Sequence, residues 1–377
     1  MCFLMIPLSL YIHIPWCIRK CPYCDFNSHK SPETLPELAY VNALLDDLKQ
    51  DLSRFPGRKL ESIFIGGGTP SLFSALAYEQ LFTGIKLLLP FKEDIEITLE
   101  ANPGTVEQQR FSDYRALGIN RLSLGIQSFN SKHLKKLGRI HDGEQAHNAI
   151  HQARKAGFSN INLDIMHGLP NQSIEEGLDD LRQAMNHQPE HLSWYQLTIE
   201  PNTLFYKQRP ILPNDDTLGV LEEEGFALLQ SHQFHRYEIS AFSREGMASR
   251  HNLNYWLFGD YLGIGAGAHG KLSHDAIYRT RKHRQPKDYL DLNKSFLAES
   301  CVIKPEDYLF EFMLNTTRLE QAISRSLLTD RTGLCFERVA SKFIQAASIG
   351  LITLSPESWQ VTALGRRYTN DLQAMFL

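Results

Sequence analysis

Short apolar segments that alternate with amphipathic stretches constrain the fold of this 377-residue chain more than any other feature. Each apolar segment has the length of a buried strand, and polar or glycine-rich residues follow nearly all of them directly. Strands that alternate with helices in this way are typical of right-handed βαβ units and a parallel sheet. The six expected strands lie at residues 9–15, 62–65, 95–100, 121–126, 160–166 and 191–199.

The polar residues at the strand ends favour a barrel over a doubly wound open sheet. A (β/α) barrel builds its site from the C-terminal ends of many strands, whereas an open sheet concentrates its site at one switch point. The six units fall short of the eight that close a complete barrel. We therefore predict an α/β fold with a partial, open (β/α)6 barrel.

The alternating pattern changes near residue 240. An aromatic- and glycine-rich stretch follows at residues 251–270, and the tail contains helix-like segments and an expected hairpin at residues 351–361. Helices followed by a hairpin are typical of a small α+β, winged-helix-like module. We predict three parts, namely a barrel at residues 1–239, a connector at residues 240–300 and a C-terminal domain at residues 301–377.

The charge balance argues against a nucleic-acid partner, and the hydrophobicity argues against a transmembrane segment. The chain has 39 lysine and arginine residues and 43 aspartate and glutamate residues, which gives a net charge of −4 and no global basic field for nucleic acid. No window approaches the ~18 consecutive apolar residues of a membrane span. We therefore expect no nucleic-acid partner and no transmembrane segment.

Three of the six cysteines lie within eight residues, in the pattern Cys17-x3-Cys21-x2-Cys24 directly after the first expected strand. Such clustering indicates a metal centre in a reducing compartment, so we expect a cytoplasmic protein. A structural zinc site needs four ligands, and Asp25 or His29 would have to complete it. An iron–sulfur cluster held by only three cysteines leaves one iron open to an exchangeable ligand. The residues alone leave both kinds of site open, with the cluster favoured.

The cysteine motif, together with the sequence GGGTP at residues 66–70 after the second strand, resembles the signature of the radical S-adenosylmethionine (SAM) superfamily. The resemblance implies that the three cysteines hold a [4Fe–4S] cluster whose remaining iron is chelated by the amine and carboxylate of SAM. Glycines at this turn would let the backbone approach the methionine amino group closely. The resemblance also implies the SAM-contacting residues Tyr11, Tyr23, Gly67, Gly68, Thr69, Glu100, Gln127, Arg139 and Asp164.

Within this superfamily the chain resembles the oxygen-independent coproporphyrinogen III oxidase-like family, and in particular the HemW-type haem chaperones. Asp25 and Phe26 follow Cys24 where the oxidase has a further cysteine, and His251-Asn252-x-x-Tyr255-Trp256 is a motif of the chaperone branch. The resemblance implies a monomer or haem-linked dimer that binds haem and transfers it to acceptor proteins, including respiratory ones. It implies no turnover as a coproporphyrinogen dehydrogenase.

Two other functions remain as alternatives. The first is the oxidase, which would decarboxylate coproporphyrinogen III to protoporphyrinogen IX by radical SAM chemistry. The second is a SAM-binding redox sensor with neither haem nor turnover.

The haem contact is expected at the HNxxYW motif. Haem iron often takes a histidine ligand and the macrocycle needs apolar faces, and His251 with its aromatic neighbours would supply both. Packing at the start of a helix is the alternative role of this motif, and His13 and His269 are further candidate ligands. The basic stretch at residues 279–287 either meets the haem propionates or is a solvated surface.

Overall fold

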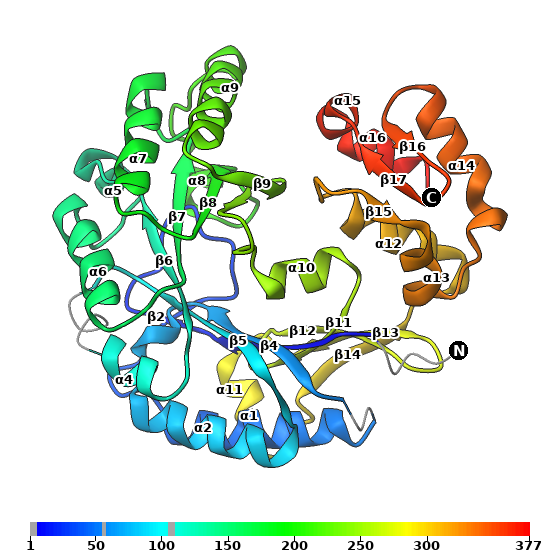
Figure 1. Cartoon of the computed structure of the whole chain (residues 1–377). Coiled ribbons are helices and arrows are strands. Elements are labelled where there is room, and N and C mark those ends of the chain that lie inside the picture. The colour runs from blue at the N-terminus through cyan, green and yellow to red at the C-terminus, as the bar shows by residue number, and fades with distance from the viewer. Residues whose placement is uncertain (1–5, 55–57, 105–109) are drawn as a thin grey trace.

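The computed structural model describes residues 6–54, 58–104 and 110–377 (Figure 1). All six expected strands are present and neighbour one another in chain order as parallel strands, which confirms the partial barrel. Their side chains are mostly buried on both faces, as expected for a parallel sheet covered by helices. The strands are β1 (Leu8–Ile14), β4 (Leu60–Gly67), β5 (Phe91–Ala101), β6 (Arg121–Gln127), β7 (Ile161–His167) and β8 (His191–Gln196).

Helices cover the outer face of the curved sheet (Figure 1). Local sequence explains where several of them begin, since α6 and α7 each start with a capping box, formed by Asp142 with Gln145 and by Ser173 with Glu176. Among the described residues, no helix is both long and apolar enough to cross a membrane. The barrel helices are α1 (Glu37–Leu52), α2 (Ala75–Leu88), α4 (Phe111–Ala116), α5 (Ser131–Lys136), α6 (Gly143–Lys155), α7 (Ile174–Asn186), α8 (Leu204–Lys207) and α9 (Asp215–Ser231).

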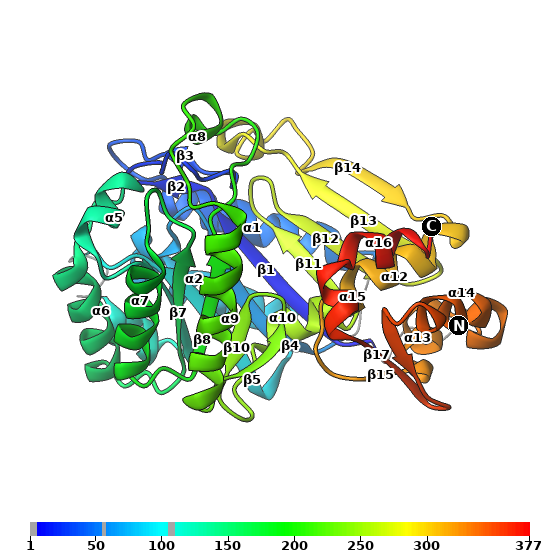
Figure 2. The same ribbon diagram turned by 90° about the horizontal axis from the view of Figure 1, so that it is seen from above.

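The sheet continues beyond the six barrel strands at both edges, so that it has twelve strands within the described residues. At one edge, β10 (Ala241–Ser243) and β9 (His235–Glu238) follow β8 in antiparallel orientation. At the other edge, β11 pairs in parallel with β1, and three antiparallel strands follow it (Figure 2). These strands are β11 (Asp260–Ile264), β12 (His269–Ser273), β13 (Ile277–Lys282) and β14 (Leu297–Val302).

The division of the chain at residues 239 and 300 stays a prediction. The structure adds that the segment expected as a connector supplies β10, β11, β12, β13 and most of β14 to the barrel sheet, together with α10 (Arg250–Trp256) and α11 (Pro286–Tyr289).

Buried ion pairs attach the added strands to the barrel. The Lys282 ammonium group, 1% exposed, pairs with the carboxylates of Asp47 and Asp51 on α1. Asp260 on β11 accepts hydrogen bonds from both Arg58, at 2.6 Å, and Lys271, at 2.9 Å. Removing one partner of such a pair leaves an uncompensated buried charge, which is costly. Part of the basic stretch at residues 279–287 therefore has a structural role.

The C-terminal residues form a separate small module, which stands to one side of the barrel in orange and red in Figure 1. The expected hairpin is present as β16 with β17, and β15 pairs with β17 to make a three-stranded sheet. Its side chains build a second core around Phe312, Phe343 and Trp359, to which Phe258 and Ile277 of the preceding segment also contribute. The elements are α12 (Tyr308–Thr316), β15 (Ile323–Ser324), α13 (Arg325–Thr332), α14 (Phe336–Ser348), β16 (Ile352–Leu354), β17 (Ser358–Val361), α15 (Ala363–Arg367) and α16 (Thr369–Ala374).

Candidate functional site

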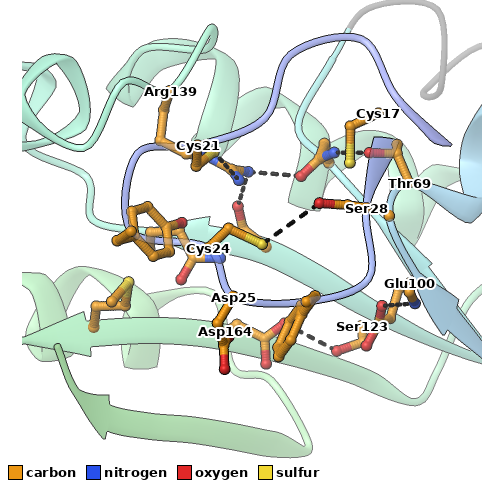
Figure 3. Close-up of a pocket in the computed structure, with 18 of the residues that line it drawn as sticks. Cys17, Cys21, Cys24, Asp25, Ser28, Thr69, Glu100, Ser123, Arg139 and Asp164 are labelled. Atoms are coloured by element: carbon orange, nitrogen blue, oxygen red, sulfur yellow. Dashed lines mark hydrogen bonds between the residues drawn. The ribbon is translucent and has the colours of Figure 1, made fainter. Parts of the chain in front are cut away.

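A cavity of about 440 Å³ lies at the C-terminal ends of the parallel strands (Figure 3). This volume is in the range of small-molecule and cofactor sites. The loop after β1 supplies the cysteines, and the ends of β4 to β8 supply polar side chains. The structure brings together in this cavity eleven of the residues predicted from sequence, namely Cys17, Cys21, Cys24, Tyr23, Gly67, Gly68, Thr69, Glu100, Gln127, Arg139 and Asp164.

The cysteine loop is held at both of its ends and carries donors to the sulfur atoms. β2 (Trp16–Cys17) pairs with β3 (His29–Lys30), which closes the loop. The Arg139 Nη1 atom donates to Cys21 Sγ at 3.7 Å, and Ser28 Oγ lies 3.8 Å from Cys24 Sγ. Burial raises the pKa values of Cys17 and Cys24 above the ordinary thiol value, while the hydrogen bond from Ser28 lowers both. The pKa values of Cys17 and Cys24 stay raised on balance, so iron binding would have to displace their protons.

The spacing of the cysteines does not suit a single metal ion. In the described part of the chain, no group of three histidine, cysteine or acidic side chains could hold one ion. The zinc alternative, which needs Asp25 or His29 as a fourth ligand, therefore has no support here. In an iron–sulfur cluster each cysteine binds a different iron, so the thiols stand further apart. The three cysteines line one cavity, and a cluster held by them would have one iron left open.

Neighbouring protein atoms leave no room for a side chain at two of the glycines at the end of β4. A Cβ atom on Gly68 would lie 2.5 Å from the backbone oxygen of Trp16. A Cβ atom on Gly67 would lie 2.7 Å from the His13 ring, and the φ angle of Gly67 is +118°. A side chain at either position would displace neighbouring atoms. Both glycines also line the cavity, so a close approach of a ligand to their backbone stays a prediction.

Two partly buried carboxyl groups, Glu100 and Asp164, line the cavity at the strand ends (Figure 3). Glu100 accepts a hydrogen bond from the Gly67 backbone at 3.2 Å, and Asp164 accepts one from Ser123 Oγ at 3.1 Å. Burial, and next the charge of Asp164, raise the pKa of Glu100 to about 8. Burial also raises the pKa of Asp164. Desolvated carboxyl groups in this position can bind a cation or the hydroxyl groups of a sugar.

The partly buried guanidinium group of Arg139 also lines the cavity. The Arg139 Nη2 atom donates to Asn102 Oδ1 at 2.6 Å and to the backbone oxygen of Gly125 at 2.8 Å. On another wall, the Tyr195 hydroxyl donates to Gln127 Oε1 at 2.7 Å. Asn102 and Tyr195 were not among the predicted site residues, although Asn102 directly follows β5 and Tyr195 lies near the end of β8. The fixed orientation of Arg139 suits a carboxylate ligand.

Tyr11, predicted as a SAM contact, does not line this cavity but a neighbouring one of about 560 Å³. Its hydroxyl donates to Nδ1 of His13 at 2.9 Å. This direction follows because Nε2 of His13 donates to the Asn27 backbone oxygen at 2.9 Å. The two cavities share the wall residues Phe26, Gly67 and Glu100.

His251 lies in the packed interior, on α10, and lines neither cavity. It is 2% exposed, and its ring stacks on Phe64 with the centroids 4.8 Å apart. Burial, and next the charge of Arg121, lower the pKa of His251 to about 3. Of the HNxxYW motif, it is Tyr255 that lines a cavity. The structure thus gives His251 the packing role weighed above, and a haem contact for it stays a prediction.

Comparisons with known proteins agree with this architecture. Residues 11–184 match the sequence model of the radical SAM superfamily, and residues 303–368 match that of the HemN C-terminal domain. The E. coli coproporphyrinogen III oxidase HemN has the same fold, with a TM-score of 0.83 and 24% identity over 98% of this chain and 90% of that chain.

Curated relatives extend the match to the full length. The haem chaperone HemW of Haemophilus influenzae is 50% identical over 98% of each chain. HemW of Escherichia coli is 48% identical over 98% of each chain, and HemW of Bacillus subtilis is 33% identical over 98% of this chain and 99% of its own. The chain therefore belongs to the HemW family of radical SAM proteins.

Proposed function

We propose that this protein is a haem chaperone that binds haem and transfers it to acceptor proteins, and that it carries a SAM-ligated [4Fe–4S] cluster. The observation that carries the proposal is the full-length identity of 41–50% to four proteins named as the haem chaperone HemW. The cysteine-lined cavity supports the cofactor part of the proposal, because the three cysteines and the polar side chains Glu100, Arg139 and Asp164 line the same pocket.

The residues of the first cavity divide into two groups under this proposal. Cys17, Cys21 and Cys24 hold the cluster, which leaves one iron for the amine and carboxylate of SAM. Arg139 faces the SAM carboxylate, and Glu100 and Asp164 bind the ribose or the methionine end. Tyr23 covers the adenine side, while Gly67, Gly68, Thr69 and Gln127 complete the pocket.

The oxidase function is less well supported. The likeness to HemN, at 24% identity, concerns the fold. Asp25 and Phe26 stand after Cys24 where the oxidase resemblance calls for a cysteine. Phe26 is 61% exposed and lines both cavities, so an apolar side chain occupies the position between them. We therefore propose that the cluster and SAM regulate haem binding rather than turn over a porphyrinogen.

Location and partners follow from the same proposal. Three accessible thiols that bind iron require a reducing compartment, so we place the protein in the cytoplasm. Its partners are haem and haem-acceptor proteins, including respiratory proteins. Its oligomeric state is a monomer or a haem-linked dimer. Nucleic acid is not among the partners.

Anaerobic reconstitution tests this function. The full chain is loaded with iron and sulfide, titrated with ferric haem and followed by absorbance, and then mixed with an apo-form haem acceptor. Stoichiometric haem uptake and its transfer to the acceptor are the expected results. SAM, a reductant and coproporphyrinogen III are added in a parallel assay. Formation of protoporphyrinogen IX, with little haem affinity, would instead establish the oxidase.

A further inference from the structure

The second cavity has the size and lining of a separate ligand site. Its volume of about 560 Å³ falls in the range that encloses most of a cofactor-sized ligand. Aromatic side chains and basic groups share its lining, which consists of Tyr11, His13, Phe26, Asn27, Gly67, Glu100, Tyr255, Tyr261, Gly267, His269 and Arg284. The aromatic side chains and Arg284 suit an aromatic ligand that carries a carboxylate, while the Glu100 carboxyl group, whose pKa is raised to about 8, is mostly protonated at neutral pH.

The three candidate histidines differ in whether a ring nitrogen is free to bind a ligand in the second cavity. His13 lines the cavity, but both of its ring nitrogens are engaged, by Tyr11 and by the Asn27 backbone. His251 is buried outside the cavity. His269 lines the cavity at the start of β12 and is exposed, and its ring has no hydrogen-bond partner among the residues that the structure describes.

The protonation state of His269 also suits a metal ligand. Partial desolvation, and next the positive charges of neighbouring arginines, lower the pKa of this imidazole against the opposing effect of Glu299. A neutral imidazole is the form that coordinates iron. His269 is therefore both reachable from the cavity and in the form that binds metal.

Arg284 is the matching cation at the same cavity. Two other arginines of the basic stretch are neutralised, since Arg279 pairs with Glu311 at 2.6 Å and Arg281 pairs with Glu299 at 2.9 Å. Arg284 is exposed, lines the cavity and makes no ion pair within the described residues. A guanidinium group that is not paired is suited to bind a carboxylate from a ligand.

We propose that haem binds in the second cavity, with His269 as the axial ligand of the iron and Arg284 paired with a haem carboxylate. The proposal rests on the proposed haem-chaperone function and assigns its binding site. Phe26, Tyr255 and Tyr261 supply apolar surface for the macrocycle, so that the HNxxYW motif contributes through Tyr255 rather than through His251. Histidine ligation of haem iron together with an apolar pocket is a common arrangement.

Ferric haem titration of the reconstituted full-length protein tests the site, with the position of the Soret band and the dissociation constant as readouts. His269→Ala is compared with His251→Ala and with His274→Ala, a matched exposed histidine on the same hairpin. We expect His269→Ala to shift the band and weaken binding on the order of tenfold or more, with 1-methylimidazole restoring the band position. Arg284→Gln should weaken binding roughly tenfold without moving the band.

The outcomes separate this proposal from the function on which it rests. If the wild-type protein takes up no stoichiometric haem, the chaperone function itself fails. If the wild type binds haem and His269→Ala has an unchanged spectrum while His251→Ala shifts it, the function stands and the assignment of the site is wrong. His274→Ala should behave as the wild type, and circular dichroism confirms that each variant is folded.

Discussion

Replacing Glu100 with glutamine should stabilise the SAM-free protein at alkaline pH and have little effect under acidic conditions. The pKa of Glu100 is about 8 in the folded state, against an ordinary value of 4.5. Below pH 4.5 the carboxyl group is protonated in both the folded and the unfolded chain, so burial carries no ionisation penalty. Between these pKa values the unfolded chain loses the proton first, and stability falls as the pH rises. Above pH 8 the whole penalty is present. Glutamine is neutral throughout and avoids it.

The size of the effect follows from the pKa. A difference of one unit between the pKa values of the folded and unfolded states corresponds to about 1.4 kcal/mol, so the full rise in the pKa of Glu100 corresponds to about 5 kcal/mol. Water in the cavity screens the carboxylate, and we expect about 2 to 4 kcal/mol at pH 8.5. Glutamine also keeps an oxygen that can accept the hydrogen bond from the Gly67 backbone. The substitution should therefore remove the charge and leave the local contacts in place.

Calorimetric melting of both proteins at pH 5 and pH 8.5 measures this difference. The melting temperature of the Glu100→Gln variant should exceed that of the wild type by several degrees at pH 8.5, at about 2 to 4 °C per kcal/mol. The gain should be much smaller at pH 5. Glu93→Gln, at the exposed start of the same strand, controls for the loss of one charge. An equal gain at both pH values would refute the reasoning from burial.

Three further substitutions test a close backbone contact, a donor to the cysteine loop and a buried ion pair. Gly68→Ala should lower the free energy of unfolding by about 1 to 3 kcal/mol, because the added Cβ atom would meet the Trp16 backbone. The control Gly219→Ala, whose Cβ atom would have nothing within 4 Å, should be neutral or slightly stabilising. Equal melting temperatures of the two variants would contradict this. Arg139→Met should lower the iron content per reconstituted chain, since it removes the donor to the cysteine loop, and an unchanged iron content would show that the arginine does not support the cluster. Lys282→Met should lower the free energy of unfolding, measured with denaturant at pH 8, by about 3 to 5 kcal/mol, because it leaves the buried carboxylates of Asp47 and Asp51 without their cation. A loss below 1 kcal/mol would contradict a stabilising buried ion pair.

The strands and the first cavity could be predicted because their signals are local. Apolar runs of strand length show where the parallel strands lie, and Glu100 and Asp164 sit in or at the end of such runs. Since parallel strands present their C-terminal ends at one edge of the sheet, the strand-end residues that the resemblance implied could be expected to lie at one site.

The second cavity could not be predicted in this way. Tyr11 and His13 are two residues apart on β1, so the period of a strand places them on one face, but not in a particular pocket. Their pocket depends on the pairing of β1 with β11, whose sequence lies more than 200 residues away along the chain. The stretch that contains β11 is rich in glycine and aromatic residues, which obscures the strand pattern. His251 was favoured by its motif, whereas its burial is decided by the tertiary packing of α10.

The wall formed by Phe26, Gly67 and Glu100 belongs to both cavities, so two ligands that occupy them would contact the same residues. A ligand that repositions the wall, or changes the charge on Glu100, alters the binding free energy of its neighbour. Thermodynamic reciprocity then requires the neighbour to alter the affinity of the first ligand by the same factor. The effect of SAM on haem affinity therefore predicts the effect of haem on SAM affinity. A protein that releases its haem when SAM leaves must also hold SAM more tightly while it is loaded.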